Sequence, residues 1–160
     1  FVIHHARRTV LHVRVTEHPT AGWIIQQLRE AFAYDAVPRY LVFDNDKKYG
    51  TDVLAVIDHM GIRCKQITPY SPWQNGAAER WVETVRRDLL DHVIVLNERH
   101  LHWLLSEFVA YYHDDRTNLG LGKGTPSERV PASKPNGDAA IVGHPRLGGL
   151  HHRYEWRQAA

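Results

Sequence analysis

Several residue types and patterns are scarce in this 160-residue chain. Its single cysteine, Cys64, excludes an internal disulfide, and no run of apolar residues approaches the length of a membrane span. The net charge is only +2, so the chain has no overall basic signature. Aspartate does not occur in residues 1–34. A site that needs several aspartates therefore cannot draw them from these first 34 residues.

The remaining composition is that of a folded domain. Hydrophobic residues make up 43% and charged residues 24% of a chain that is long enough for one domain with a real core. Residues 117–160 carry six Lys or Arg against three Asp or Glu, whereas residues 76–116 carry five against eight. The C-terminal segment is therefore the better candidate for contacts with phosphate, although a solvated surface explains the same excess equally well.

The hydrophobic patterns predict an α/β domain with a mixed sheet and helices packed against it. The predicted strands cover residues 1–5, 9–15, 39–43 and 62–67, with 39–43 expected to be buried. The predicted helices cover residues 21–32, 51–60, 75–93 and 98–115, with Thr20 and Asn97 as N-caps. Because the chain opens on Phe-Val-Ile, which is typical of the middle of a strand, we expect it to be a fragment of a longer protein.

A change in composition predicts where the domain ends. Residues 117–149 hold seven of the eleven glycines and four of the eight prolines. This composition predicts an extended arm over residues 117–160, with a short terminal strand at 150–156, rather than a second core. The domain itself is predicted over residues 1–116.

The most informative residues are two carboxylates, Asp44 and Glu79, separated by 34 residues. Asp44 directly follows the predicted strand at 39–43, and open α/β sheets place their ligands at the carboxyl ends of strands. Mg²⁺ favours one or two protein carboxylates together with water and phosphate oxygens. The Asp-Asn-Asp run at residues 44–46 is also a common composition for an ordinary polar turn.

Glu79 falls in the first turn of the predicted helix at 75–93, where the helix dipole favours an anion. Two prolines, an asparagine and a glycine between residues 69 and 76 predict a kinked, mobile loop ahead of it. An isolated glutamate at such a position is usually an ordinary helix-terminal residue. The strand-end aspartate at a fixed distance upstream favours a shared carboxylate site instead.

Three segments carry a family resemblance. Asp44-Asn45 followed by Tyr49-Gly50 is similar to an Asp-Asn-Gly-x-x-Phe strand end. Residues 71–80, Ser-Pro-Trp-Gln-Asn-Gly-Ala-Ala-Glu-Arg, are similar to Ser-Pro-x-x-Asn-Gly-x-x-Glu-Arg. Residues 111–126, from Tyr-Tyr-His through Arg116 to Thr-Pro, are similar to Tyr-Asn-x-x-Arg-x-His-x-x-Leu…Thr-Pro. Over about residues 1–126 the chain thus resembles the catalytic core of retroviral-type integrases and DDE transposases of bacterial insertion sequences.

The resemblance implies an RNase H-like fold and a metal-dependent DNA nucleotidyltransferase of the DDE type. In this family three acidic residues hold two divalent metals, Mg²⁺ or Mn²⁺, which activate a water or a DNA 3′-hydroxyl and stabilise the leaving oxygen at a phosphodiester. Asp44 would be the second acid and Glu79 the third, as catalytic residues and as metal ligands. The first acid would lie on a strand upstream of residue 1. We therefore expect this chain to lack the first strand and to be inactive alone.

The resemblance also implies DNA contacts. Arg86 follows Glu79 by seven residues, or two helical turns, so the two share a face, and the family often has a basic residue facing DNA there. Trp73, Asn75 and Arg80 are further candidates. Trp73 either stacks on a base or anchors the loop on the core. The implied partners are the element ends and the target DNA, bridged by a homo-oligomer, with no membrane and no small-molecule substrate; the implied location is the bacterial cytoplasm, at the nucleoid when acting.

Two departures from the family pattern leave alternatives open. Asp46 stands where the family often has glycine, and Glu83 stands where some integrases have a basic residue. One alternative is an inactive, truncated mobile-element remnant that folds and binds DNA or self-associates. A different RNase H-like nuclease is a third reading, which the closing segment at 111–126 disfavours. The upstream sequence separates the first two, because an aspartate on a preceding strand supports the enzyme.

Overall fold

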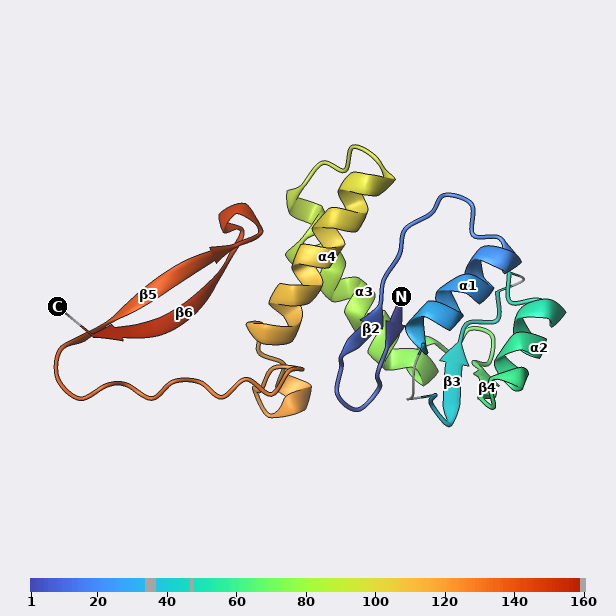
Figure 1. Cartoon of the computed structure of the whole chain (residues 1–160), viewed down its shortest axis with the longest axis horizontal. Helices are drawn as coiled ribbons and strands as arrows, with labels where there is room; N and C mark the ends of the chain where they lie inside the picture. Colours follow the sequence, from blue (N-terminus) through green and yellow to red (C-terminus); the bar gives the residue numbers. More distant parts are fainter. Residues whose placement is uncertain (34–36, 47, 159–160) are drawn as a thin grey trace.

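The computed structural model describes residues 1–33, 37–46 and 48–158, so the last two residues of the predicted arm lie outside the described part. The strands are β1 (Val2–Ile3), β2 (Val10–His12), β3 (Tyr40–Phe43), β4 (Arg63–Gln66), β5 (Ala139–Arg146) and β6 (His151–Gln158). The helices are α1 (Ala21–Ala31), α2 (Thr51–His59), α3 (Gly76–Asp88) and α4 (Glu98–Asp114). Short 3₁₀ turns are η1 (Pro72–Asn75), η2 (Leu90–His92), η3 (Leu119–Leu121) and η4 (Leu147–Gly149). The predicted α/β class is confirmed, and Figure 1 shows β5 and β6 as a long hairpin projecting from the other elements.

The strands of the described residues form three two-stranded sheets instead of the one mixed sheet that was predicted. β1 pairs antiparallel with β2, β3 pairs parallel with β4, and β5 pairs antiparallel with β6. The first two sheets are separate, and β1 and β3 do not pair with each other. The prediction that strand 39–43 is buried was wrong: Tyr40 and Val42 are 43% and 42% exposed, since β3 has a neighbouring strand on one side only in the described part of the chain.

Both predicted N-caps are confirmed. The Thr20 hydroxyl accepts a hydrogen bond from the Trp23 N–H at 3.2 Å. The Asn97 side-chain oxygen accepts one from the His100 N–H at 2.9 Å. Caps of this kind satisfy an otherwise unpaired helix-terminal amide and stabilise a helix by about 1 kcal/mol each. The starts of α1 and α4 are therefore fixed by local sequence.

Helix α3 ends at Asp88, five residues before the predicted end at Val93. Leu89 leaves helical geometry, with φ −133° and ψ −65°, and its side chain is fully buried. The His151 ring nitrogen Nε2 hydrogen-bonds the Asp88 carbonyl oxygen at 2.7 Å, which occupies a carbonyl that a continuing helix would use. The run of β-branched residues from 93 to 95 also lowers helix propensity beyond this point.

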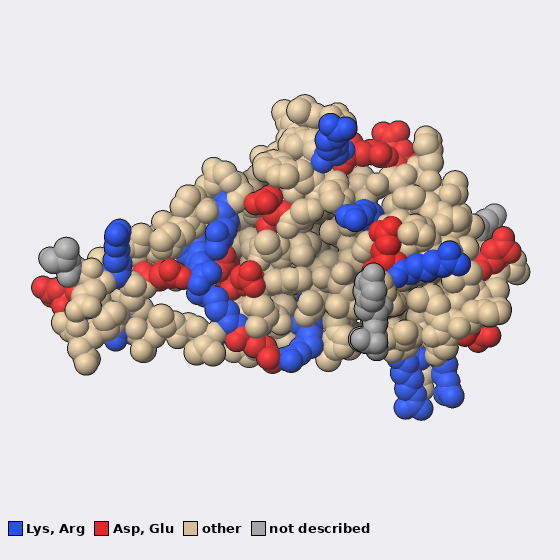
Figure 2. Space-filling view, viewed as in Figure 1, with Lys and Arg blue, Asp and Glu red and all other residues tan. Residues whose placement is uncertain are grey.

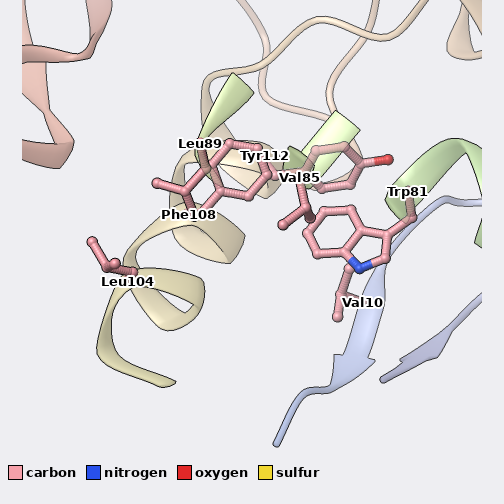
Figure 3. Packing of buried hydrophobic residues seen from close by; sticks show 7 residues of the cluster. All are labelled: Val10, Trp81, Val85, Leu89, Leu104, Phe108 and Tyr112. Atoms are coloured by element: carbon pink, nitrogen blue, oxygen red, sulfur yellow. The ribbon is translucent and has the colours of Figure 1, made fainter. Parts of the chain in front are cut away.

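One hydrophobic cluster joins α3, α4 and β2 (Figure 3). At its centre the Trp81 ring lies 4.6 Å from the Tyr112 ring, edge to face, and 5.8 Å from the Phe108 ring. Such aromatic pairs add about 0.5–1.5 kcal/mol each beyond the burial of their area. The buried members are Val10, Trp81, Val85, Leu89, Leu104, Phe108 and Tyr112.

A second cluster forms where α1 and α2 pack around β3. Val53 and Ile57 of α2 are fully buried within it, and Phe43 at the end of β3 is 6% exposed. Val2 of β1 packs against the same cluster, so the first hairpin contacts both cores. The cluster fixes the carboxyl end of β3, where Asp44 begins.

The C-terminal segment contains more strand than its composition predicted. β5 and β6 pair over eight residues each, whereas β5 falls in the stretch expected to be an extended arm. A lone hairpin is marginally stable in water, so its contacts with the body matter. The Asp115 side chain, 1% exposed, lies 2.8 Å from Arg146 Nε and within 4 Å of Arg129 and Arg153. The boundary between residues 116 and 117 stays a prediction.

Charges of both signs are mixed over the face shown in Figure 2. Lys or Arg and Asp or Glu side chains gather there where the hairpin approaches the body, as expected from the Asp115 contacts. The mixture of positive and negative side chains on this face agrees with a net charge of only +2. Separately, none of the helices in the described residues is both long and apolar enough to cross a membrane.

Val85→Ala and Val82→Ala form a matched pair on α3, because Val85 is 7% exposed and Val82 is 50% exposed. We expect Val85→Ala to lower the free energy of unfolding by roughly 2 kcal/mol through lost burial and a residual cavity. Val82→Ala should change the free energy of unfolding by less than about 0.5 kcal/mol, because Val82 is half exposed. The gain in helix propensity is the same in both variants, so the difference between them reports burial. Urea denaturation measures both, and equal effects would contradict the assigned buried face of α3.

His113 predicts a pH-dependent part of the stability. Burial lowers the pKa of its ring, and its Nε2 accepts a hydrogen bond from the Val10 N–H at 2.9 Å, so the folded state holds it neutral. This stabilisation is complete above the unfolded value of about 6.5 and is lost as the pH falls from there towards the lower folded pKa.

We expect His113→Gln, whose amide oxygen can still accept from Val10, to flatten the loss of stability below about pH 6.5. His5→Gln is the matched control, since His5 is exposed and forms no hydrogen bond within the described residues. Urea denaturation at a series of pH values checks this. An identical slope in the wild type and His113→Gln would show that His113 does not contribute to it.

Candidate functional site

Asp44 lies at the carboxyl edge of the β3–β4 sheet. The two strands run parallel and in register from Tyr40↔Arg63 to Phe43↔Gln66. The Ile67 N–H donates to the Phe43 carbonyl oxygen at 3.1 Å and extends the pairing by one step. The chain after β3 therefore emerges beside the chain that leads from β4 into α3. This placement agrees with the strand-end position predicted for Asp44.

The Asp44 carboxylate is exposed and makes no hydrogen bond or ion pair within the described part of the chain. Asp46 differs, because its side chain accepts from the Lys48 N–H at 3.0 Å and lies 3.0 Å from Lys48 Nζ. Hydrogen bonds from the Lys48 backbone and side chain lower the pKa of Asp46. The two carboxylates of this turn thus have different surroundings, and Asp44 is the one available to a ligand.

A side-chain clamp holds the connection between β4 and α3. The Gln74 side-chain oxygen accepts from the Thr68 N–H at 2.8 Å, and its nitrogen donates to the Thr68 hydroxyl at 3.3 Å. Thr68 comes two residues after β4, and Gln74 lies in η1, just before α3. The clamp closes the loop so that the start of α3 stays near the edge of the sheet that carries Asp44.

Glu79 lies in the first turn of α3 with its side chain exposed. The rotation of the helix is fixed by the burial of Ala77, Trp81 and Val85. An α-helix turns about 100° per residue, so Glu79, Val82 and Arg86 lie together on the opposite, outward side. The predicted shared face of Glu79 and Arg86 follows from this arrangement.

The two carboxylates match the oxygen ligands that Mg²⁺ takes from proteins, usually one or two carboxylates with water and phosphate. Within the described residues no group of three His, Cys, Asp or Glu side chains comes together to hold a metal. The described chain therefore offers part of the three-acid set that the resemblance implies. Asp44 and Glu79 as catalytic and metal-binding residues stay a prediction.

The other predicted residues differ in their settings. Arg86 has a 77% exposed side chain with its Nε 3.7 Å from Asp91 Oδ1, an exposed pair that contributes little to stability. Trp73 is 73% exposed and so does not anchor the loop in the core. Asn75 is the N-cap residue of α3, without a side-chain capping bond. Arg80 points about 100° away from Glu79 around the helix axis and therefore lies off the shared face.

Tyr70 was not among the predicted residues, although it stands next to them. Its side chain is 97% exposed and its backbone has φ +61°, an uncommon conformation for a residue with a side chain. Tyr70 and Trp73 thus place two aromatic rings in solvent on the loop before Glu79. The signal in the sequence was its position between Pro69 and Ser71, inside the loop predicted to be kinked.

Residues 60–126 match the family model of the integrase core domain. Over this segment the chain is similar to an integrase core domain. The matched segment includes Glu79 and the closing segment at 111–126, which confirms the family resemblance.

Two known proteins extend the comparison. The chain is 30% identical over 129 residues to "Uncharacterized protein K02A2.6" of Caenorhabditis elegans, covering 79% of this chain and 10% of that protein. A chain in the cryo-EM structure of the simian T-cell lymphotropic virus intasome in complex with PP2A regulatory subunit B56 gamma is similar in fold, with a TM-score of 0.54 and 18% identity. That match covers 89% of this chain and 54% of the other. This chain thus spans about a tenth of the length of the first protein and about half of the second.

Gln74→Ala tests the clamp that positions the start of α3. We expect the loss of both bonds to Thr68 to speed hydrogen exchange of the Thr68 amide, while the free energy of unfolding falls by about 1 kcal/mol. Asn75→Ala, at a neighbouring residue without a side-chain capping bond, is the control and should leave this amide unchanged. An unchanged Thr68 exchange rate in Gln74→Ala would exclude the clamp.

Proposed function

We propose that this integrase core domain belongs to an enzyme that cleaves DNA and transfers DNA strands during integration or transposition. The observation that supports the proposal is how the strand pairing and the loop before α3 position the segments that carry Asp44 and Glu79. The parallel register of β3 and β4 sets Asp44 at one sheet edge, and the Gln74 clamp returns the chain to that edge before Glu79. Two exposed acids on separate, rigid elements are a suitable arrangement for metal-dependent phosphoryl transfer.

The residues of the proposed site have distinct roles. Asp44 and Glu79 would hold Mg²⁺ or Mn²⁺ in a two-metal site, and such metals activate a water or a DNA 3′-hydroxyl and stabilise the leaving oxygen of a phosphodiester. Arg86, on the face of Glu79, would bind a phosphate of the DNA strand. Trp73 would stack on an exposed base beside the site. Asn75, at the start of α3, would contact the same strand.

We further propose that the site is completed by a first acid on a strand upstream of residue 1. Support comes from the sheets: β1 pairs only with β2 and β3 only with β4 in the described residues, so each has an edge free for another strand. A strand added to β3 would bring its residues next to Asp44. The proposed fold is then RNase H-like, with the 160-residue chain as an incomplete catalytic core that is inactive alone.

The proposed partners follow from the same function. The protein would bind the ends of a mobile element and a target DNA, and a homo-oligomer would bridge the two ends. The similarity to the intasome chain is one of fold and gives these partners a structural precedent. For a bacterial insertion-sequence enzyme the proposed location is the cytoplasm, at the nucleoid when it acts.

A strand-transfer assay with the protein extended upstream tests the site. We expect Asp44→Asn and Glu79→Gln each to lower the rate at least about 100-fold with Mg²⁺, because each removes a charged metal ligand. Asp46→Asn is the matched control in the same turn, since the Asp46 carboxylate is held by Lys48. Unchanged activity in either site variant would overturn the assignment.

The 160-residue chain is assayed in parallel, and we expect no cleavage or strand transfer. Activity of this chain with Mg²⁺ would show that the first acid does not lie upstream. If the extended protein binds DNA and is inactive, the remnant alternative replaces the enzyme.

A further inference from the structure

A cavity of about 340 Å³ lies beside α3. It is lined by the turn between β1 and β2, by α3, by the end of α4 and by residues 116–120. Neither Asp44 nor Glu79 is among its lining residues, so the cavity is distinct from the candidate carboxylate site. Its charged lining residues are Arg8, Arg80, Glu83, Arg87 and Arg116.

Two of the four arginines are already neutralised. Arg116 Nε donates to Asp88 Oδ2 at 2.8 Å, and Arg87 Nε donates to Asp88 Oδ1 at 3.1 Å. Arg87 also lies 3.7 Å from Glu83. Burial alone would raise the pKa of Asp88, but the hydrogen bonds from Arg116 and Arg87 outweigh it and lower this pKa. Asp88 and Glu83 thus pair with Arg87 and Arg116 and neutralise their charges.

Arg8 and Arg80 keep their positive charges uncompensated. Neither forms an ion pair or a side-chain hydrogen bond within the described residues, and Arg8 Nη1 is buried with no hydrogen-bond partner there. A buried guanidinium nitrogen without an acceptor is costly, which favours an anion from outside the chain. The cavity therefore has an excess of about two positive charges beside unused donors.

The backbone holds Arg8, which lines this cavity, in an unusual conformation. Its φ is +60°, which costs a residue with a side chain about 1 kcal/mol or more. Hydrogen bonds from the Arg8 N–H to the His4 carbonyl and from the His4 N–H to the Thr9 carbonyl, both 2.8 Å, close the turn around it. Around the Tyr112 hydroxyl, burial raises the pKa while the charges of Arg116, Arg8 and Arg80 act against that increase. The three guanidinium groups thus converge on one end of α4.

We propose that this arginine cavity binds a backbone phosphate of DNA, with Arg8 and Arg80 as its main ligands. The planar guanidinium group presents paired donors that fit phosphate oxygens, and such charge-assisted bonds are stronger than neutral ones. The inference rests on the proposed function, because it takes the ligand to be DNA. It adds a contact about 100° around α3 from Glu79, which allows one DNA segment to reach Glu79 while a different phosphate is held by Arg80.

DNA binding by the 160-residue chain tests the cavity without the metal site. Fluorescence anisotropy with a short labelled duplex, in EDTA and over a series of salt concentrations, compares the wild type with Arg8→Gln/Arg80→Gln. We expect binding about tenfold weaker at ~0.1 M salt and a log–log salt slope smaller by about 1–2, since each lost phosphate contact removes close to one unit. The control is Arg29→Gln/Arg99→Gln, which removes two exposed arginines that form no ion pair within the described residues.

The control should bind within about twofold of the wild type. Equal binding by the two double variants, or no DNA binding by the wild-type chain, would overturn the proposal. A free anion would use the same guanidinium donors, so inorganic phosphate is titrated by calorimetry. If phosphate binding needs Arg8 and Arg80 while DNA binding does not, the proposal is also overturned. Arg8→Lys/Arg80→Lys keeps the charge and should restore part of the affinity, which separates a lost contact from a lost fold.

The DNA-binding measurement does not depend on the outcome of the strand-transfer assay with Asp44→Asn, because neither the metal nor Asp44 takes part in it. The cavity and the proposed catalytic function can therefore fail independently.

Discussion

The packing of Trp81 against Phe108 and Tyr112 is the contact on which the other features depend. It joins α3 to α4 and, with the burial of Ala77 and Val85 on the same helix, fixes the rotation of α3 about its axis. Once that rotation is set, Glu79 and Arg86 must face outwards and Arg80 must face the arginine cavity. The buried residues of α3 thus assign two different faces of one helix, about 100° apart, to two proposed ligand contacts.

The register of β3 and β4 is the second constraint. A slip of one residue would reverse the direction of every side chain in the strand. Phe43 would then leave the core, and Asp44 would turn away from its present direction. Burial of Phe43 among Val53, Ile57 and Ile62 excludes that slip. The Gln74–Thr68 bonds then tie the residue before α3 to the chain just after β4. The two carboxylates owe their placement to one strand pairing and one side chain, and not to the flexible turn composition around them.

Features set by nearby residues could be predicted from the sequence. The caps at Thr20 and Asn97 depend on contacts within the first turn of one helix. Features set by distant residues could not. The end of α3 depends on His151, and the exposure of β3 depends on which strands are its neighbours. Arg8 lies seventy residues or more from the other arginines of its cavity, and no local pattern connects them.

The free edge of β3 has a consequence for the chain in solution. Tyr40 and Val42 are partly exposed apolar residues on a strand whose second edge has no neighbour among the described strands. Unprotected strand edges of this kind pair with other chains. Two copies that met through β3 would bury the position proposed for a missing strand and obstruct Asp44.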